Sequence, residues 1–388
     1  MIKYLKTFGL LIGLYFLLMI LAYAIPNQWM EDNIRSGVDY IENTEGRWVN
    51  HYYMSVGATT DGWTDLSEMD RALDDEYDSI IKRAMSNGEY PRYWHGNHVL
   101  IRLLFVFFTY IQIRYLSQFL VIGSISIVFS LIWKRTNVGI ALSFLISVIL
   151  AYPFTMSLSL QYIIPFMAMM SGMIFILLKY REEMNTGIYF FVMGSVINFL
   201  DLLTFPLISL MMPLVLVMTW RLESKGSFEN FLFAVKSSIQ WAIGYGLTWI
   251  VKWVLATVIL RKNVLKNALE QVLFRSSSDI GEHISRVGTV KKVFGVYFMF
   301  SPWLTRFCVM ILGIIVLFYS VKYYTRVIAV LKKIWVFMPI AIIPCFWVFV
   351  LANHSYIHYG FVYRIFMGTA FALGCFGFEY IRRLRESS

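Results

Sequence analysis

The sequence predicts an all-α, polytopic integral membrane protein with about ten transmembrane helices and a long outer loop after the first. Of its 388 residues, 58% are hydrophobic and only 15% are charged. A soluble domain carries about 25% charged residues, so this chain cannot cover itself with a water-facing surface. Apolar runs of about 20 residues, the length that crosses the bilayer core as a helix, recur along the chain. These observations exclude a disordered protein, a coiled coil and an ordinary cytosolic enzyme.

The first apolar run, Phe8 to Ala24, follows Lys3 and Lys6, as the core of a signal peptide would. No small-residue cleavage site stands out after it, so we expect it to be retained as the first span. Nine further apolar runs predict the other spans: residues 113–133, 138–156, 160–178, 187–204, 206–220, 234–259, 305–321, 335–352 and 359–380.

Basic residues predict the orientation of these spans. They gather on alternate connections and at the chain end: Lys134 and Arg135, Lys179 and Arg181, Arg221 and Lys225, Arg326, Lys332 and Lys333, and Arg382, Arg383 and Arg385. These positions share a side with Lys3 and Lys6, which the positive-inside rule makes cytoplasmic. Ten spans then give a multi-pass protein of the cell membrane with both termini in the cytoplasm. The net charge of +10 reflects this placement, and no nucleic-acid partner is expected.

The chain is expected to form a single membrane domain, 1–388, with two long outer loops, 26–112 and 260–304. Residues 26–92 carry 14 acidic and 6 basic side chains, whereas residues 261–292 carry 7 basic and 3 acidic ones. The opposite charges suggest that the two loops face each other above the bundle; two unrelated solvated surfaces are the alternative. Inverted repeats, the usual mark of secondary transporters, are not evident.

The acidic loop contains Thr60-Asp61-Gly62-Trp63-Thr64-Asp65, with two carboxylates four residues apart around a Gly-Trp turn. Asp65 is equally suited to cap a helix expected over Leu66 to Met85. Asp61 has less reason to be a cap and is the stronger candidate for a general base. The other acids of this helix, Glu68 among them, are expected mostly on its solvated surface.

The segment from Tyr90 to His98 places Arg92, Trp94 and His95 just before an apolar run that carries Arg102. Aromatic and basic residues at a membrane entrance form either an interfacial belt or a platform on which rings stack on sugar and arginine binds phosphate. Residues 99–112 are expected to form a helix on or in the outer leaflet.

Five more candidates lie at the outer ends of predicted spans or between them: Asp201, Lys252, Arg364, and His354 and His358 on a short outer turn. Polar side chains at such depth usually turn into the protein or a polar cavity, although Lys252 could instead snorkel to the surface. The histidine pairs lack the Glu of the H-E-x-x-H motif, so no metal ligands are assigned. A divalent metal held by these histidines and an outer carboxylate remains an alternative.

In layout, with a first span, a large acidic outer loop and then a bundle of spans, the chain resembles the GT-C class of membrane glycosyltransferases. Arg92-Tyr93-Trp94-His95-Gly96 and the turn from Asn353 to His358 look like elements of bacterial membrane proteins of that kind. The resemblance covers most of the chain. It implies sugar transfer from a polyprenyl-phosphate-linked donor, a membrane lipid, to a glycan, lipid or protein acceptor on the outer leaflet.

The resemblance also implies a catalytic acid just after the first span, where this sequence has Glu31 and Asp32. The base is therefore expected among Asp61, Asp65, Glu31 and Asp32. The substrate-binding residues are expected among Arg92, Trp94, His95, Arg102, Asp201, Lys252, His354, His358 and Arg364.

Two other functions remain open. A Wzy-like oligosaccharide polymerase would also be polytopic with large outer loops, but with an arginine-dominated site and no required loop carboxylate. A lipid or polysaccharide transporter or flippase would need polar residues through the full membrane depth, and the central thirds of most predicted spans are apolar.

Overall fold

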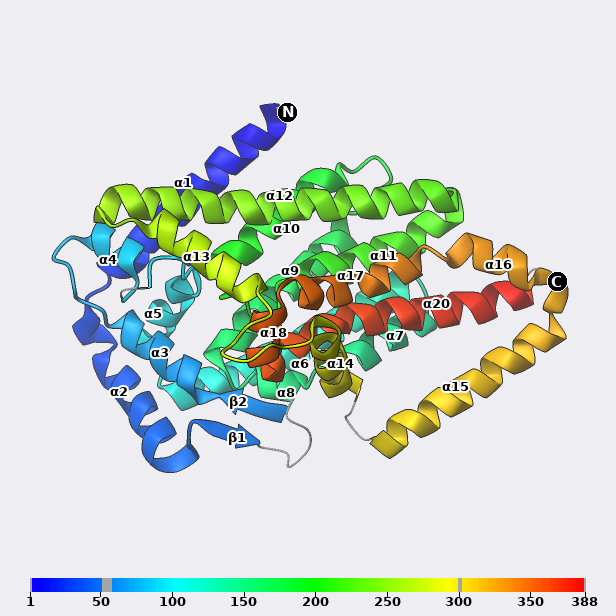
Figure 1. Cartoon of the computed structure of the whole chain (residues 1–388), viewed down its shortest axis with the longest axis horizontal. Coiled ribbons are helices and arrows are strands. Elements are labelled where there is room, and N and C mark those ends of the chain that lie inside the picture. Colours follow the sequence, from blue (N-terminus) through cyan, green and yellow to red (C-terminus); the bar gives the residue numbers. More distant parts are fainter. Residues whose placement is uncertain (1, 51–57, 89, 299–301, 387–388) are drawn as a thin grey trace.

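The computed structural model describes residues 2–50, 58–88, 90–298 and 302–386. Within them the regular structure is helical apart from one small hairpin and an isolated bridge (Figure 1). The prediction of an all-α chain is therefore confirmed for these residues.

The first helix, α1 (Ile2–Ala24), leads into an outer segment of short elements. Strands β1 (Trp48–Asn50) and β2 (Thr59–Asp61) pair antiparallel, with Trp48 opposite Asp61. The remaining elements of this segment are short helices: η1 (Asn27–Trp29), α2 (Glu31–Tyr40), η2 (Ile41–Glu45), α3 (Gly62–Ala72), α4 (Ile80–Ser86) and α5 (Asn97–Phe107).

The helix expected over Leu66 to Met85 is wrong in its start and in its continuity. Asp61, not Asp65, is the N-cap of α3, because its carboxylate accepts a hydrogen bond from the Thr64 main-chain N–H at 3.1 Å. The helix then breaks between α3 and α4. There the Asp74 carboxylate accepts from the main-chain N–H groups of Glu76 and Gly88, both at 3.0 Å, which stabilises a turn instead of a helix.

The rest of the chain forms the helical bundle. Its helices follow in chain order: α6 (Tyr110–Arg135), α7 (Val138–Ile149), α8 (Pro153–Met156), α9 (Leu160–Lys179), α10 (Thr186–Leu200), α11 (Ile208–Ser224), α12 (Ser227–Leu260), α13 (Val264–Ser276), α14 (Arg286–Phe298), α15 (Pro302–Lys322), η4 (Tyr324–Arg326), α16 (Val327–Ile334), α17 (Phe337–Val350), α18 (Ala352–Ile357), α19 (Tyr359–Val362), η5 (Tyr363–Phe366) and α20 (Met367–Glu386).

The core of the bundle is centred on α11, in which every residue from Ile208 to Thr219 is buried. A helix that is apolar on all sides belongs in an interior. The closest packing joins α10 to α12. A Cβ added at Gly194 would collide with the Trp241 carbonyl oxygen, and one at Gly244 with that of Phe191. The two glycines thus allow the backbones to approach closely.

Among the described residues, five helical stretches are long and apolar enough to cross a membrane: α1, α6, α9, α12 and Tyr359–Glu386. A sixth candidate joins Met310–Lys322 to Tyr324–Ile334 across a bend of 91°. Each of the ten predicted runs contains a helix. However, α7, α10 and α17 have only 12, 15 and 14 residues, fewer than the roughly 20 that a span requires. The structure thus gives five or six candidate spans by length and composition.

Candidate functional site

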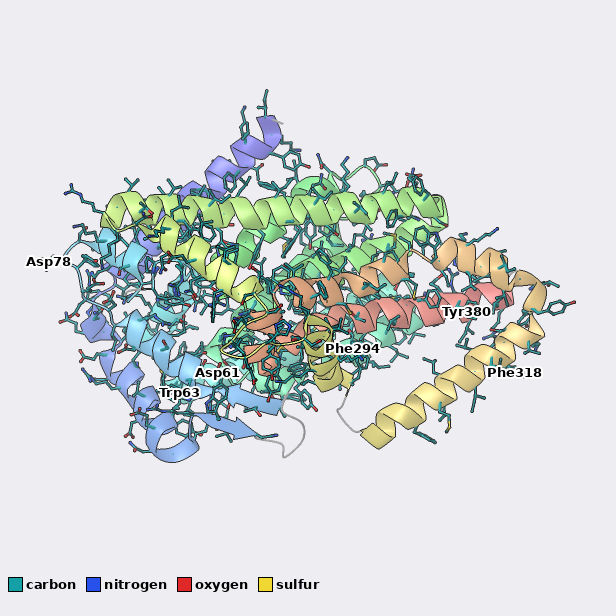
Figure 2. All side chains as sticks on the ribbon, viewed as in Figure 1. Asp61, Trp63, Asp78, Phe294, Phe318 and Tyr380 are labelled. Carbon is teal, nitrogen blue, oxygen red and sulfur yellow. The ribbon has the colours of Figure 1, made fainter. Side chains whose placement is uncertain are left out.

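A cleft of about 340 Å³ opens where the outer segment meets α13 and the short helices before α20. We call it the outer cleft. Its lining comes from segments far apart in the chain: Trp63, Thr64, Ser67, Arg71, Tyr90, Tyr93, Gln161, Leu202, Arg275, His354, His358 and Phe361. In Figure 2, Asp61 and Trp63 mark the junction of β2 and α3 on the outer-segment side of this cleft. Charged, imidazole and aromatic groups thus share one opening.

A larger cavity of about 690 Å³ lies among α1, α10 and α12, beside Tyr4 at the start of α1. Its lining is mostly apolar, and its polar contributions come from Asn185, Thr186, Lys236, Ser237 and Gln240. The residues around it include none of the candidates that the sequence predicts. The outer cleft, which includes two of them, is therefore the candidate functional site.

Arg275 of α13 and His354 of α18 form the central polar pair of the outer cleft. An Arg275 Nη1–H donates to His354 Nδ1 at 2.8 Å, so the proton of the imidazole is on Nε2, which donates to the Leu203 carbonyl oxygen at 2.9 Å. Burial, and then the neighbouring Arg275 charge, hold the pKa of His354 well below its ordinary value. His354 is therefore neutral and fixes the position of the guanidinium.

His358 lies one helical turn after His354 and extends the same polar wall. Its ring stacks on Phe361 with 5.0 Å between centroids and lies 4.8 Å from the His354 ring. Burial, with a smaller contribution from Arg275, lowers the pKa of His358 to about 4. At neutral pH both imidazoles are thus uncharged, and arginine supplies the positive charge of this wall.

A second wall, which adjoins Arg275, is built around Tyr90, whose hydroxyl oxygen accepts from Arg275 at 3.5 Å. The Tyr90 ring stacks on Tyr93 with 5.6 Å between centroids and is contacted by the guanidinium groups of Arg71, at 4.8 Å, and Arg92, at 4.3 Å. Arg92 also donates to the Asn267 side-chain oxygen on α13 at 2.6 Å. The predicted residue Arg92 therefore lies beside the cleft wall and joins the two outer loops.

The two candidate carboxylates of the outer segment have different environments. Asp61 is buried behind the cleft wall and accepts hydrogen bonds from Thr64, which lines the cleft. Burial raises the pKa of Asp61. Asp65 is buried deeper, where it accepts from Tyr110 at 2.7 Å and Ser159 at 2.9 Å, and burial raises its pKa to about 6. Asp65 thus ties α3 to the starts of α6 and α9.

Glu31 and Asp32, the acids that follow the first span, lie on α2. Glu31 pairs with Arg35 one turn later; the Arg35 side chain is largely exposed and that of Glu31 is half-buried. Asp32 is exposed in the same first turn of α2. Neither residue lines the outer cleft.

Three further candidates are buried away from the cleft, where they satisfy main-chain groups. Arg102 donates to three main-chain carbonyl groups and so ties the end of α1 to α3. Lys252 donates to the Met85 carbonyl oxygen at 2.9 Å, and Trp94 donates to that of Thr248 at 2.9 Å. These contacts join α12 to the outer segment.

The last three candidates are buried and are not among the described residues that line the outer cleft. The Asp201 carboxylate accepts from the Thr204 N–H and holds the turn that follows α10. The Arg364 guanidinium is fully buried, 4.3 Å from the centroid of the Tyr162 ring. His95 is fully buried behind Tyr90, with 5.9 Å between ring centroids.

Sequence reasoning did not identify Arg71, Arg275 or Tyr90 as cleft residues. The basic composition of 261–292 points to the second loop, but no local pattern distinguishes Arg275 from its basic neighbours. The expected solvation of Glu68 is wrong, because it is fully buried. A usable signal was the helical spacing of Asp65, Glu68 and Met69, which share the buried face of α3.

No family model, no curated protein and no solved structure matches this chain.

Proposed function

We propose that this protein is a membrane glycosyltransferase that moves a sugar from a polyprenyl-phosphate-linked donor to a glycan, lipid or protein acceptor. The observation that carries the proposal is the shared opening of guanidinium, imidazole and aromatic groups in a chain of apolar helices. One guanidinium group can donate two parallel hydrogen bonds to two oxygens of a phosphate. Aromatic rings offer flat apolar faces on which a sugar can stack. The outer cleft thus has guanidinium groups that can bind the phosphate and aromatic rings that can bind the sugar of a phosphate-linked sugar. The layout that resembles the GT-C class agrees with this function.

In this proposal all ten apolar runs span the cell membrane and both termini are cytoplasmic, as the basic connections indicate. The short helices α7, α10 and α17 would cross together with the residues that flank them. The outer cleft would then lie at the outer leaflet, where the headgroup of a polyprenyl lipid is presented.

The proposed transfer forms one bond and breaks one. An acceptor hydroxyl oxygen attacks the anomeric carbon, the bond from that carbon to the phosphate oxygen breaks, and its electron pair leaves with the phosphate. Arg71 and Arg275, which line the cleft, would stabilise the charge that develops there. The hydroxyl proton passes to a carboxylate. Asp61 is the best placed of the four candidates, because its carboxylate holds the cleft residue Thr64.

The Asp61→Asn variant tests the proton transfer without removing the N-cap on which the folding of α3 depends. Asparagine caps a helix about as well as aspartate, so α3 keeps its N-cap while the proton acceptor is lost. We expect sugar transfer from a radiolabelled polyprenyl-phosphate-linked donor, assayed with the purified protein, to fall about 10²- to 10⁴-fold. Membrane insertion and size-exclusion behaviour should not change. Full activity of this variant would remove Asp61 from the mechanism.

The donor site is tested by Arg275→Gln. We expect this variant to bind the polyprenyl-phosphate-linked donor more weakly, because a charged pair of donors to phosphate is lost. Lys266→Gln removes an exposed cation from the same helix and should bind the donor as the wild type does. Equal losses in both variants, or no transfer by the wild type with any polyprenyl-linked sugar, would contradict the proposed function.

One observation favours a second function, that of a Wzy-like oligosaccharide polymerase. The charged groups among the described cleft-lining residues are Arg71 and Arg275, as in an arginine-dominated site. The Asp61→Asn variant distinguishes the two functions, because a polymerase retains its activity without a loop carboxylate. Arg275→Gln should inactivate either enzyme.

A further inference from the structure

Behind the Tyr90 wall of the outer cleft, one glutamate and two histidines form a buried cluster. Glu68 comes from α3, His98 from the first turn of α5, and His95 from the bend just before α5. One side-chain ligand atom of each residue lies within 4.8 Å of those of the other two, and all three residues are buried. His98 Nε2 lies 3.1 Å from Glu68 Oε2, and His95 Nδ1 lies 3.6 Å from Glu68 Oε1.

His95 is the member of this cluster whose bonding is incomplete. Its side chain is 0% exposed, and neither ring nitrogen has a hydrogen-bond partner among the described residues. A buried polar group without a partner destabilises the fold, because its desolvation is not compensated. The φ angle of His95 is 52°, in the left-handed region that is costly for a residue with a side chain. His95 thus combines two unfavourable features, unpartnered ring nitrogens and a strained backbone, and the pair is consistent with an imidazole positioned to bind a ligand.

The surroundings of His98 orient it as a metal ligand is usually oriented. Its Nδ1 lies 2.8 Å from the Tyr23 hydroxyl, and Tyr23 lies 3.3 Å from the Asn87 side-chain oxygen. Without an ion, His98 Nε2–H donates to Glu68 Oε2 at 3.1 Å and Nδ1 accepts from Tyr23. With an ion bound to Nε2, Nδ1–H would donate to the Tyr23 hydroxyl, which would donate in turn to Asn87. Histidines that bind metals generally donate their other ring N–H to such a second group.

The distances from Glu68 to the two imidazoles are close to those between neighbouring ligands of a tetrahedral ion. Zinc binds imidazole nitrogen at about 2.0–2.1 Å and carboxylate oxygen at about 2.0–2.2 Å, so its ligands lie about 3.3–3.4 Å apart. His98 Nε2 lies 3.1 Å from Glu68 Oε2 and His95 Nδ1 lies 3.6 Å from Glu68 Oε1, so each imidazole faces a different oxygen of the same carboxylate at close to that separation. The Asn97 amide nitrogen donates to Glu68 Oε2 and helps to hold the carboxylate in place, and a water molecule would provide the fourth ligand.

We propose that Glu68, His95 and His98 bind one divalent transition-metal ion, with zinc the best match to two imidazoles and one carboxylate. Magnesium and calcium, which require oxygen ligands, do not suit this set. The ion ties α3 to the start of α5. It competes with Arg71, which donates to Glu68 Oε1 at 3.1 Å, so that metal binding turns the Arg71 guanidinium towards the cleft that it lines. The site goes beyond the proposed transfer reaction and does not depend on it.

The test is metal content. The full chain, purified without a polyhistidine tag and incubated with zinc sulfate before removal of excess metal, is expected to hold about one zinc per chain by mass spectrometry of the elements. Glu68→Gln and His98→Ala should hold less than a tenth of that amount. Glu282→Gln and His283→Ala make the same changes at exposed positions of the second outer loop and should keep the wild-type content.

A second measurement covers the case in which a ligand variant fails to fold. Cobalt(II) bound to the wild type should give the strong visible bands of a tetrahedral site, and His98→Cys should add a thiolate-to-cobalt charge-transfer band. Those spectra would support the site even if Glu68→Gln cannot be purified. A wild-type chain that takes up neither zinc nor cobalt, or ligand variants that hold as much zinc as the exposed controls, would overturn the proposal.

Discussion

At the residue scale, Asp61 and Asp65 differ in the partners that the fold gives them. Asp61 is the cap of α3 and bonds to Thr64, which lines the cleft, whereas Asp65 accepts hydrogen bonds from Tyr110 at the start of α6 and from Ser159 and Gln161 at the start of α9. The sequence places both carboxylates in the outer loop and at helical spacing. The sequence does not show which carboxylate is the cap, because the cap is the residue at which strand β2 ends and α3 begins, and that point is set by the pairing of β1 with β2.

The buried Asp65 predicts a specific dependence of stability on pH. Its pKa is raised by burial from an ordinary 3.8 to about 6, so the folded protein holds this proton more tightly than the unfolded chain does. The contribution of Asp65 therefore favours folding fully below about pH 4 and is lost as the pH rises through about 6. Two pKa units correspond to about 3 kcal/mol.

The measurement compares thermal unfolding in detergent at pH 4 and pH 7. The wild type should lose more stability over this range than Asp65→Asn, whose amide does not titrate. Asp78→Asn, at an exposed position of the same segment (Figure 2), should follow the wild type. Parallel pH profiles for the wild type and Asp65→Asn would show that burial does not hold this proton.

At the scale of elements, each apolar run of the sequence contains a helix, but the ends of the helices follow local contacts that hydropathy does not report. The run 187–204 is interrupted where Asp201 accepts from the Thr204 N–H. The run 138–156 is interrupted at Tyr152, whose φ is 55°, just before Pro153. Hydropathy averages over such single residues, which is why the existence of these helices could be predicted and their lengths could not.

The packing of α10 against α12 gives a prediction at this scale. Gly244→Ala places a methyl group against the Phe191 carbonyl oxygen, and such overpacking typically costs about 1–3 kcal/mol. We expect a lower unfolding temperature and a lower yield of monodisperse protein. Gly246→Ala makes the same change two residues later, where no heavy atom lies within 4 Å of the added Cβ, and should be neutral or slightly stabilising. Similar losses in both variants would mean that this close approach of the two helices does not exist.

At the scale of the whole molecule, the outer cleft combines side chains that the sequence keeps far apart. Arg275 and His354 are 79 residues apart and still form a hydrogen bond, while Arg92 bonds to Asn267 across 175 residues. Composition and charge predicted a helical membrane protein with polar groups in its outer loops. The pairing of those groups depends on the tertiary arrangement of the helices, for which the sequence contains no local signal.

The proposed topology predicts which surfaces a membrane-impermeant maleimide can reach. In a chain whose three cysteines, Cys308, Cys345 and Cys375, are replaced by alanine, we expect new cysteines at Asp78 and Glu282 to react from outside intact cells. New cysteines at Lys134 and Lys225 should react only after the membrane is opened. All four positions are exposed in the structure. If Asp78→Cys and Glu282→Cys were labelled from opposite sides, the two outer loops would lie on opposite sides of the membrane. That result would contradict the proposed active site, which both loops line.

The length of α12 has a mechanical consequence. Its 34 residues form a rod of about 51 Å, which runs along one side of the molecule in Figure 1 and exceeds the roughly 30 Å of a hydrocarbon core. Near its end the rod holds the main-chain oxygens of Met85, through Lys252, and Arg92, through Trp253. If α12 tilts at its N-terminal end, its C-terminal end would therefore displace the main chain at Met85 and Arg92, and with it the Tyr90 wall of the outer cleft.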